Sequence, residues 1–339
     1  MNNEENSIDT NELETFSGKI EQVKTEVSKI IVGQEKVIEL LLIAIFCRGH
    51  AIMVGVPGIG KTLLVNTMSN VMGLHFNRIQ FTPDLLPSDI VGTEIIQEHA
   101  ETGHKELTFV NGPVFTNMLL ADEINRTPPK TQAALLEAMQ ERKVTYGGKS
   151  MKLATPFFVL ATQNPIEQEG TYNLPEAQLD RFFFMLDVGY PSSAEEHEII
   201  NRFTRKYTAT PELAITAEEI IKLQSLVEDV LVREDIIEYV LRLVRATRVS
   251  EDHAAPFCRD YLSWGAGPRA SMCLILGAKA HALLCGRSYV NTDDVVAVAE
   301  PVLAHRIIVN YAAISEGVST ANVIERLLEV IDRPADVAS

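Results

Sequence analysis

The sequence predicts an α/β domain with a mainly parallel five-stranded sheet, followed by a smaller domain of helices. Short apolar runs alternate with helical stretches as far as Pro191, and only helical patterns follow it. The runs are almost unbroken in apolarity, which is typical of strands covered on both faces, so we expect three layers. The five predicted strands are Ala51–Val56, Phe76–Phe81, Asn117–Ala121, Phe157–Thr162 and Phe182–Val188.

The composition is that of a globular protein with an acidic surface. With 339 residues, 46% of them hydrophobic and 22% charged, the chain is long enough for two domains with real cores. Its 46 acidic and 30 basic residues give a net charge of −16. Such a charge repels phosphate backbones, so nucleic acid is not the expected partner.

The cysteines and the lengths of the apolar runs indicate in which cellular compartment the protein is expected. The four cysteines form no C-x-x-C pair and no zinc-type spacing, which is typical of reduced core thiols. His253 and Cys258 could be two ligands of a metal site, but no further ligands at a suitable spacing complete it, so we expect no metal there. The polar start of the chain lacks the features of a signal peptide, and the apolar run around Leu40 to Cys47 is too short to cross a bilayer. We therefore expect a cytoplasmic protein with no membrane role.

The N-terminal part is expected to contain two helices. Residues 1–12 are polar and are expected to be disordered, and the α/β domain is expected to span residues 13–191. Gly33 ends the first predicted helix, and the second runs from about Gln34 to Cys47. The first helix has one apolar face, made by residues at steps of three and four: Leu13, Phe16, Ile20, Val23, Val27 and Ile30.

Two segments interrupt the alternation of strands and helices. Residues 94–110, with Thr102-Gly103 near the tip, are predicted to form a β-hairpin. Residues 143–153 are predicted to form another, because Gly147-Gly148 suits a two-residue turn. Between them, Thr127 and two prolines predict the start of a helix. Insertions of this kind often carry function.

Residues 192–335 are predicted to form the helical domain, with no strand pattern and no internal repeat. Ser192-Ser193 caps a helix that runs to about Tyr207, and Thr216 caps the next one. Further helices are expected to open at Asp235, at Gly267-Pro268 and at Asn291-Thr292.

A glycine-rich turn follows the first strand. Residues 55–62 read GVPGIGKT and match the pattern G-x-x-x-x-G-K-[ST] at every specified position. The glycines let backbone N–H groups surround phosphates, and the following helix presents its positive end to them. We expect Lys61 to reach the β- and γ-phosphates of ATP and the Thr62 hydroxyl to hold Mg²⁺. An idle glycine turn is the alternative, and it leaves Lys61 unexplained.

Two carboxylates end the third predicted strand. Asp122 can hold Mg²⁺ through water, and Glu123 can act as the general base on the attacking water. A strand followed by a solvated turn would show the same pattern, so the pair is weak evidence by itself. Together with the glycine-rich turn it predicts an ATPase site.

Asn164 follows the fourth predicted strand in the turn Ala161-Thr162-Gln163-Asn164-Pro165. A polar residue before proline is commonly a simple turn former. In a parallel sheet, however, this strand end lies at the same edge as the phosphate site, which favours a functional role.

The order of these motifs resembles the MoxR family of AAA+ ATPases. Two further segments carry the resemblance, Leu174–Phe182 (LPEAQLDRF) and Gly265–Ala270 (GAGPRA), and it covers the chain from about Ile31 to Asp332. The resemblance implies an AAA+ αβα core, a C-terminal α-helical lid with the nucleotide between them, and assembly into a ring that is usually hexameric.

The resemblance also implies residue roles. Asn164 would be the sensor that orients the lytic water, and Arg181 the arginine finger that reaches the neighbouring subunit's site. Arg269 would be the second sensor, on the γ-phosphate of its own subunit. Residues that would contact or border the nucleotide are Ile31, Val32, Gly33, Gly55, Val56, Pro57, Gly58, Ile59, Gly60, Lys61, Thr62, Leu63, Asp122 and Arg269.

Several of these roles have ordinary alternatives. Arg269 is also explained as a surface arginine paired with an acid, and Arg181, which follows Asp180, as half of an ion pair. Many relatives have serine where this chain has Gly267, which weakens a helix cap. Arg126 is a further candidate for the subunit interface.

The two hairpins match inserts that face the ring pore in this family. Lys143, Lys149 and Lys152 make the second one basic, but Tyr146 is its only aromatic residue, and single-strand binders usually combine charge with stacking rings. A solvated hairpin or a loop that grips polypeptide is the better interpretation.

The leading hypothesis is a ring-forming ATPase that hydrolyses ATP to ADP and phosphate, with Mg²⁺, to remodel a client protein. Members of the resembled family act as chaperones, some in metalloprotein maturation, often with partners that carry a von Willebrand factor A domain. The alternatives are the motor subunit of a metal-chelatase-like complex, a nucleotide-dependent scaffold without useful turnover and, least favoured, a helicase.

Overall fold

The computed structural model describes residues 9–98, 105–165, 170–204 and 209–334. Its centre is a five-stranded sheet in the order β2-β5-β8-β1-β9, in which every neighbouring pair is parallel. The predicted sheet is therefore confirmed. Its strands are β1 (Ala51–Gly55), β2 (Phe76–Gln80), β5 (Met118–Asp122), β8 (Phe158–Gln163) and β9 (Phe184–Val188).

Helices cover both faces of this sheet, because alternate side chains of the strands point to opposite cores. Leu119 and Val159 belong to the core beneath α5 (Pro129–Glu141) and α4 (Pro87–Val91). Leu120 and Leu160 belong to the larger core on the other face. That core is closed by α1 (Thr10–Ser28), α2 (Glu35–Phe46) and α3 (Lys61–Val71).

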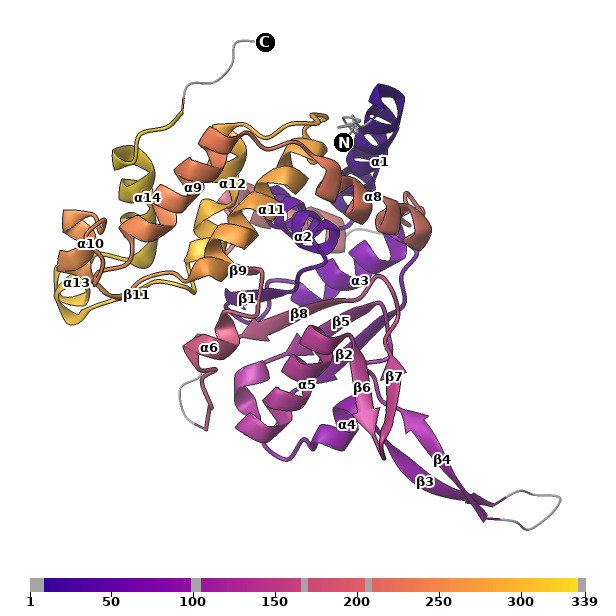
Figure 1. Ribbon diagram of the computed structural model, residues 1–339. Coiled ribbons are helices and arrows are strands. Elements are labelled where there is room, and N and C mark those ends of the chain that lie inside the picture. The colour runs from indigo at the N-terminus through magenta and orange to yellow at the C-terminus, as the bar shows by residue number, and fades with distance from the viewer. Residues whose placement is uncertain (1–8, 99–104, 166–169, 205–208, 335–339) are drawn as a thin grey trace, which may run out of the picture.

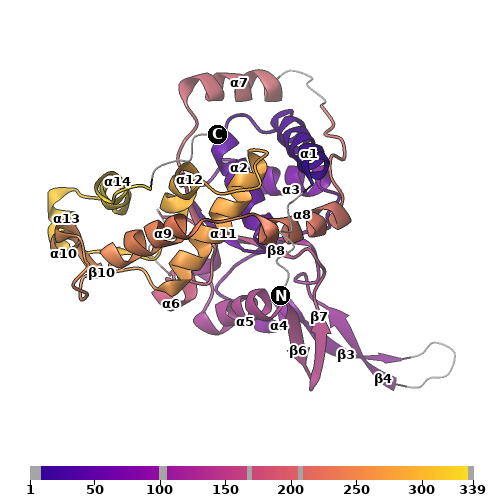
Figure 2. The same cartoon turned by 45° about the horizontal axis from the view of Figure 1, so that its top comes forward.

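Both predicted hairpins form and project from the core away from the C-terminal helices (Figures 1 and 2). One consists of β3 (Gly92–Glu98) and β4 (Lys105–Asn111), and the expected tip at Thr102-Gly103 lies outside the described residues. The other consists of β6 (Lys143–Tyr146) and β7 (Lys149–Lys152). Its turn residues Gly147 and Gly148 have φ values of 55° and 77°, as a tight hairpin turn requires.

The C-terminal part is helical, as expected, but it also contains strands. Thr216 and Asn291 cap their helices as predicted, and both belong to capping boxes. The expectation of no strand is wrong: β10 (Leu262–Trp264) pairs with β11 (Ile308–Val309). Strands this short show no alternation in a sequence. The helices are α7 (Ser193–Thr204), α8 (Ala217–Asp229), α9 (Glu234–Ala246), α10 (Pro256–Tyr261), α11 (Pro268–Leu284), α12 (Thr292–Leu303), α13 (Tyr311–Glu316) and α14 (Thr320–Val330).

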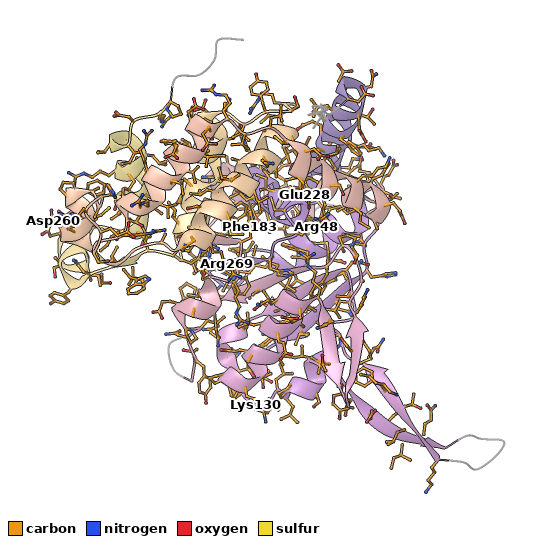
Figure 3. The ribbon with its side chains drawn as sticks, viewed as in Figure 1. Arg48, Lys130, Phe183, Glu228, Asp260 and Arg269 are labelled. Atoms are coloured by element: carbon orange, nitrogen blue, oxygen red, sulfur yellow. The ribbon has the colours of Figure 1, made fainter. Side chains whose placement is uncertain are left out.

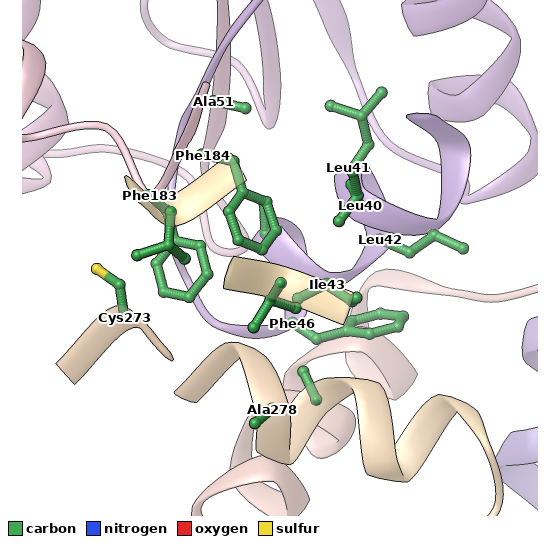
Figure 4. Close-up of a cluster of buried hydrophobic side chains, with 14 of the residues drawn as sticks. Leu40, Leu41, Leu42, Ile43, Phe46, Ala51, Phe183, Phe184, Cys273 and Ala278 are labelled. Carbon is green, nitrogen blue, oxygen red and sulfur yellow. The ribbon is translucent and has the colours of Figure 1, made fainter. Parts of the chain in front are cut away.

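The C-terminal helices pack directly on the α/β core. One continuous set of buried side chains extends from α1 to α14. Figure 4 shows its centre, where Phe46 of α2, Phe184 of β9 and Ala278 of α11 lie together. The Gln224 amide of α8 also donates to the Ile45 carbonyl of α2 at 2.8 Å. This shared core fixes the position of the helical part against α2 and β9.

Two short helices complete the described chain. They are the 3-10 helix η1 (Ile124–Arg126), which follows β5, and α6 (Glu176–Leu179), which leads into β9. In the described part of the chain, no helix is long and apolar enough to cross a membrane.

Candidate nucleotide site

The predicted site residues follow three neighbouring strands. In the sheet, β8 lies between β5 and β1, with Ala121 beside Ala161 and Val54 beside Gln163. The carboxyl ends of these parallel strands therefore meet at one edge. The structure thus brings the glycine-rich turn, the Asp122-Glu123 pair and Asn164 together, as the sequence predicted.

The glycine-rich turn has the backbone that a phosphate cradle needs. Gly58 and Gly60 have φ values of 85° and 80°, a region that side chains disfavour. Gly55 is required for another reason: a Cβ there would lie 2.6 Å from the Val188 carbonyl oxygen of β9. The eleven-residue α3 begins at Lys61, so its free N–H groups point at the turn. These features fit the phosphates of a nucleotide.

Lys61 lies inside this cradle. Its Nζ donates to the Gly55 carbonyl oxygen at 2.6 Å. Burial lowers the pKa of Lys61, and the charges of Asp122 and Glu123 oppose this shift. The ammonium and the two carboxylates are thus electrostatically coupled, as a phosphate-and-metal site requires.

Thr162 of β8 links the two carboxylate residues, and the sequence analysis assigned it no role. Its hydroxyl donates to Asp122 Oδ1 at 2.6 Å and accepts from the Glu123 N–H at 2.9 Å. The side chain is only 1% exposed. Its one signal in the sequence is a hydroxyl near the end of an apolar strand. We infer that Thr162 positions both carboxylates.

Two polar side chains of β2 also reach this pair and were not predicted. Arg78 Nη2 and Nε lie 2.6 and 3.2 Å from Asp122 Oδ2. Gln80 Nε2 donates to Glu123 Oε2 at 2.7 Å. Arg78 and Gln80 are two positions apart on β2, so they face the same side of the strand. A polar i, i+2 pair on a strand is the signal that could have found them.

Glu123 is held in a defined orientation. Its backbone has φ 58° and ψ 50°, a left-handed conformation that is uncommon for a non-glycine residue. Arg126 Nη1 lies 3.0 Å from Glu123 Oε2. Arg126 therefore contacts the carboxylate of its own chain, and its expected place at a subunit interface stays a prediction.

The segment expected to border the adenine lies beside the glycine-rich turn. Gln34, which directly follows Ile31, Val32 and Gly33, donates from Nε2 to the Ile59 carbonyl oxygen at 3.2 Å. Asn164 is 7% exposed at the end of β8. Both observations fit the expected contacts.

The arginines lie elsewhere. Arg181 and Arg269 line one recess together with residues 47–50, which precede β1, whereas the glycine-rich turn follows β1. Figure 3 labels Arg269 and Arg48 in this region. Five strand residues separate these ends by about 16 Å, more than an arginine side chain spans. In this structure Arg269 therefore does not lie beside the glycine-rich turn of its own chain, and the expected contact with the γ-phosphate of its own subunit is not observed. Because α11 packs on α2, it begins at the amino edge of the sheet.

Arg269 and Arg181 differ in whether they pair with Asp180. Asp180 pairs with Arg306 at 2.8 Å and with Arg269 at 3.8 Å. Arg269 thus has an acidic neighbour, as its ordinary explanation requires. Arg181 makes no ion pair within the described residues, so the simple pairing with Asp180 is not observed.

Oxygen ligands for Mg²⁺ are present at the carboxyl edge. Thr62 lies in the first turn of α3, and Asp122 ends β5 two strands away. Hydroxyl and carboxylate oxygens are the ligand types that Mg²⁺ prefers. The residues therefore fit this ion.

A second group of possible ligands has a structural explanation. Suitable atoms of His281, Cys285 and Asp294 lie within 4.8 Å of one another. Arg287 already pairs with both Asp294 oxygens, at 2.6 and 2.8 Å, and Asn291 N–H donates to the same carboxylate. The carboxylate is thus satisfied within the helix cap.

Comparisons with known proteins agree with this geometry. Residues 50–184 match the family described as "ATPase family associated with various cellular activities (AAA)", and residues 254–327 match the AAA lid domain. The Mycobacterium tuberculosis protein named Chaperone MoxR1 is 45% identical over 318 residues, covering 93% of this chain and 82% of that protein. The Paracoccus denitrificans protein named MoxR is 30% identical, with coverages of 90% and 93%.

A solved structure is also similar over almost the whole chain. The crystal structure of a candidate ATPase from Cytophaga hutchinsonii has a TM-score of 0.88 and 42% identity, and the match covers 96% of this chain and 98% of that one. Together with the AAA+ sheet order and the helical lid, these similarities establish the family. The chain belongs to the MoxR family of AAA+ ATPases.

Proposed function

We propose that this protein hydrolyses ATP to ADP and phosphate, as a ring that remodels a client protein. The observation that carries the proposal is the meeting of Lys61 with Asp122 and Glu123 at one edge of the sheet, beside the N-terminus of α3. The family membership supports a nucleotide-binding role in the same place.

Each residue at this edge has a defined task. Lys61 and the N–H groups of the turn neutralise the β- and γ-phosphates. Thr62 and Asp122 would hold Mg²⁺, which when bound neutralises charge on the transferred phosphoryl group. Glu123 takes the proton from the attacking water, and Asn164 orients that water.

A neighbouring subunit would complete the site. Arg181 and Arg269 lie at the amino edge of the sheet, so neither can serve the glycine-rich turn of its own chain. We propose that both act on the nucleotide of the next subunit in a hexameric ring. Hydrolysis then depends on assembly, because each subunit supplies its arginines to another.

The exposed surface of the β3–β4 hairpin favours a polypeptide client. Ile96 and Leu107 are directly opposite each other and are 69% and 63% exposed. An apolar pair on a projecting arm suits contact with protein better than contact with a phosphate backbone. The MoxR1 relative is named a chaperone, which points in the same direction. A von Willebrand factor A domain partner and a role in metalloprotein maturation rest on the family resemblance.

A Glu123→Gln variant tests the proposal. It should bind ATP as the wild type does but release phosphate at least about 100-fold more slowly, because the base is lost while the cradle is kept. Binding of a fluorescent ATP analogue and steady-state phosphate release measure the two properties. Turnover at the wild-type rate would contradict the assignment of Glu123. Affinity capture with this variant in ATP should also retain the client.

A further inference from the structure

A recess of about 410 Å³ at the amino edge of the sheet carries an unusual concentration of arginines. It lies where α11 meets the start of β1 and β9, and Figure 3 shows Arg48, Phe183 and Arg269 at this junction. We call it the arginine recess. The arginines that line it are Arg48, Arg142, Arg181, Arg269 and Arg306.

The charges of the arginine recess are only partly compensated. Arg306 pairs with Asp180 at 2.8 Å, and Arg48 pairs with Glu228. Arg142 and Arg181 have no carboxylate partner among the residues that the structure describes. Glu141 is the acidic residue among those that line the recess. In a chain with a net charge of −16, two guanidiniums without a carboxylate partner thus line one recess.

Arg142 has an unfavourable backbone conformation, and its surroundings also disfavour its charged form. It ends α5 with a φ of 50°, in the left-handed region where glycine is preferred at the end of a helix. Its Nη2 donates to the Arg48 carbonyl oxygen at 2.9 Å, and burial together with the charge of Arg48 lowers the pKa of Arg142. A backbone strained in this way is a reason to look for a use of the guanidinium.

Arg48 occupies the same kind of position at the end of α2. Its φ is 52°, and four non-glycine residues of the described chain have a positive φ: Gln34, Arg48, Glu123 and Arg142. The next residue, Gly49, lies so close to β9 that a Cβ would be 2.5 Å from Phe183 Cβ. The segment that accepts the Arg142 hydrogen bond is therefore fixed against the sheet.

An anion with several oxygens fits the arginine recess, because a planar guanidinium can donate two parallel hydrogen bonds to one phosphate group. The phosphates of the same chain's nucleotide are excluded, because the glycine-rich turn lies at the opposite end of β1, about 16 Å away. Arg181 and Arg269, which the proposed function assigns to the neighbouring nucleotide, line the same recess. The geometry therefore points to a phosphate group that a second copy of this chain brings.

We propose that the arginine recess receives the terminal phosphates of the nucleotide bound to the adjacent subunit, and that Arg142 contacts them alongside Arg181. This inference rests on the proposed function. Arg142 would then be a third arginine acting between subunits, and Arg48 would position it through its carbonyl oxygen. A contact that strengthens as charge moves onto the phosphoryl oxygens would raise kcat more than ATP affinity.

The test uses Arg142→Gly and Arg142→Lys in the full-length chain. Arg142→Gly suits the left-handed backbone, so its thermal midpoint should equal or exceed that of the wild type. Its kcat for phosphate release should fall about 10–100-fold, with unchanged binding of a fluorescent ATP analogue and unchanged assembly by light scattering. Arg142→Lys should recover part of the rate. Arg245→Ala, an exposed arginine of α9 outside the recess, is the matched control and should keep full activity.

Mixed assemblies decide whether Arg142 acts between subunits. Arg142→Gly subunits have an intact turn, and Lys61→Ala subunits have an intact recess, so about one interface in four would combine both in a random mixture. The mixture should therefore be more active than either variant alone. No recovery in a confirmed mixed assembly, or wild-type kcat in Arg142→Gly, would overturn the inference. If the wild type itself releases no phosphate, it is the proposed function that fails.

Discussion

Thr162→Val should disturb the positions of Asp122 and Glu123 while leaving nucleotide binding unchanged. The substitution keeps the shape of the side chain but removes the hydroxyl that donates to Asp122 and accepts from the Glu123 N–H, at 2.6 and 2.9 Å. A hydrogen bond to a charged group contributes about 1.5–3 kcal/mol, and an unpaired buried N–H costs about 1–3 kcal/mol. The added methyl group returns about 1 kcal/mol through burial. The free energy of unfolding should therefore fall by about 1.5–5 kcal/mol.

The catalytic effect follows from the same two contacts. Without the bridge, both carboxylates can move from their positions, and a displacement of about 1 Å costs up to about 100-fold in rate. We expect kcat to fall about 10–100-fold, while the affinity for an ATP analogue without Mg²⁺ stays unchanged, because the glycine-rich turn is untouched.

Thr162→Ser provides the control, since it keeps the hydroxyl and loses only a methyl group. Steady-state phosphate release, thermal unfolding and fluorescent-nucleotide binding should be measured on all three proteins. A folded Thr162→Val protein with the kcat and thermal midpoint of the wild type would refute the bridge.

Other predictions concern the turn, the arginine finger and a buried histidine. Lys61→Ala should lose ATP affinity in a nucleotide-binding titration, and unchanged affinity would remove the turn from the site. Arg181→Ala should lose about 10³–10⁵ in kcat and regain activity when mixed with Lys61→Ala subunits; a stable mixed ring without recovery would argue against action between subunits. Burial lowers the pKa of His50 to about 4, so its protonation favours the unfolded chain. The free energy of unfolding should therefore keep the full contribution of neutral His50 above about pH 6.5 and lose roughly 3 kcal/mol of it as the pH falls to 4. In denaturant titrations at several pH values, a His50→Gln variant should lack this pH-dependent loss.

Much of the site could be predicted because its signals are local. The turn at residues 55–62 combines glycine conformations, a lysine and a helix start within one short segment, so its chemistry is readable without neighbours. Asp122-Glu123 and Asn164 follow strands whose parallel order brings their ends together. By contrast, Thr162, Arg78 and Gln80 act through contacts between strands. Their signals in the sequence, a hydroxyl near a strand end and a polar i, i+2 pair, do not say which residue of another strand they reach.

The amino-acid sequence by itself determined the layered α/β core, the nucleotide cradle and the acidic pair, because apolar periodicity and short motifs encode local structure. Only the tertiary structure decided which end of the sheet receives the arginines of the helical lid. The reason is that α11 is placed by packing against α2 and β9 across one shared core, between residues that lie far apart in the chain. That packing puts Arg269 beside Arg181 and Arg142 rather than beside Lys61.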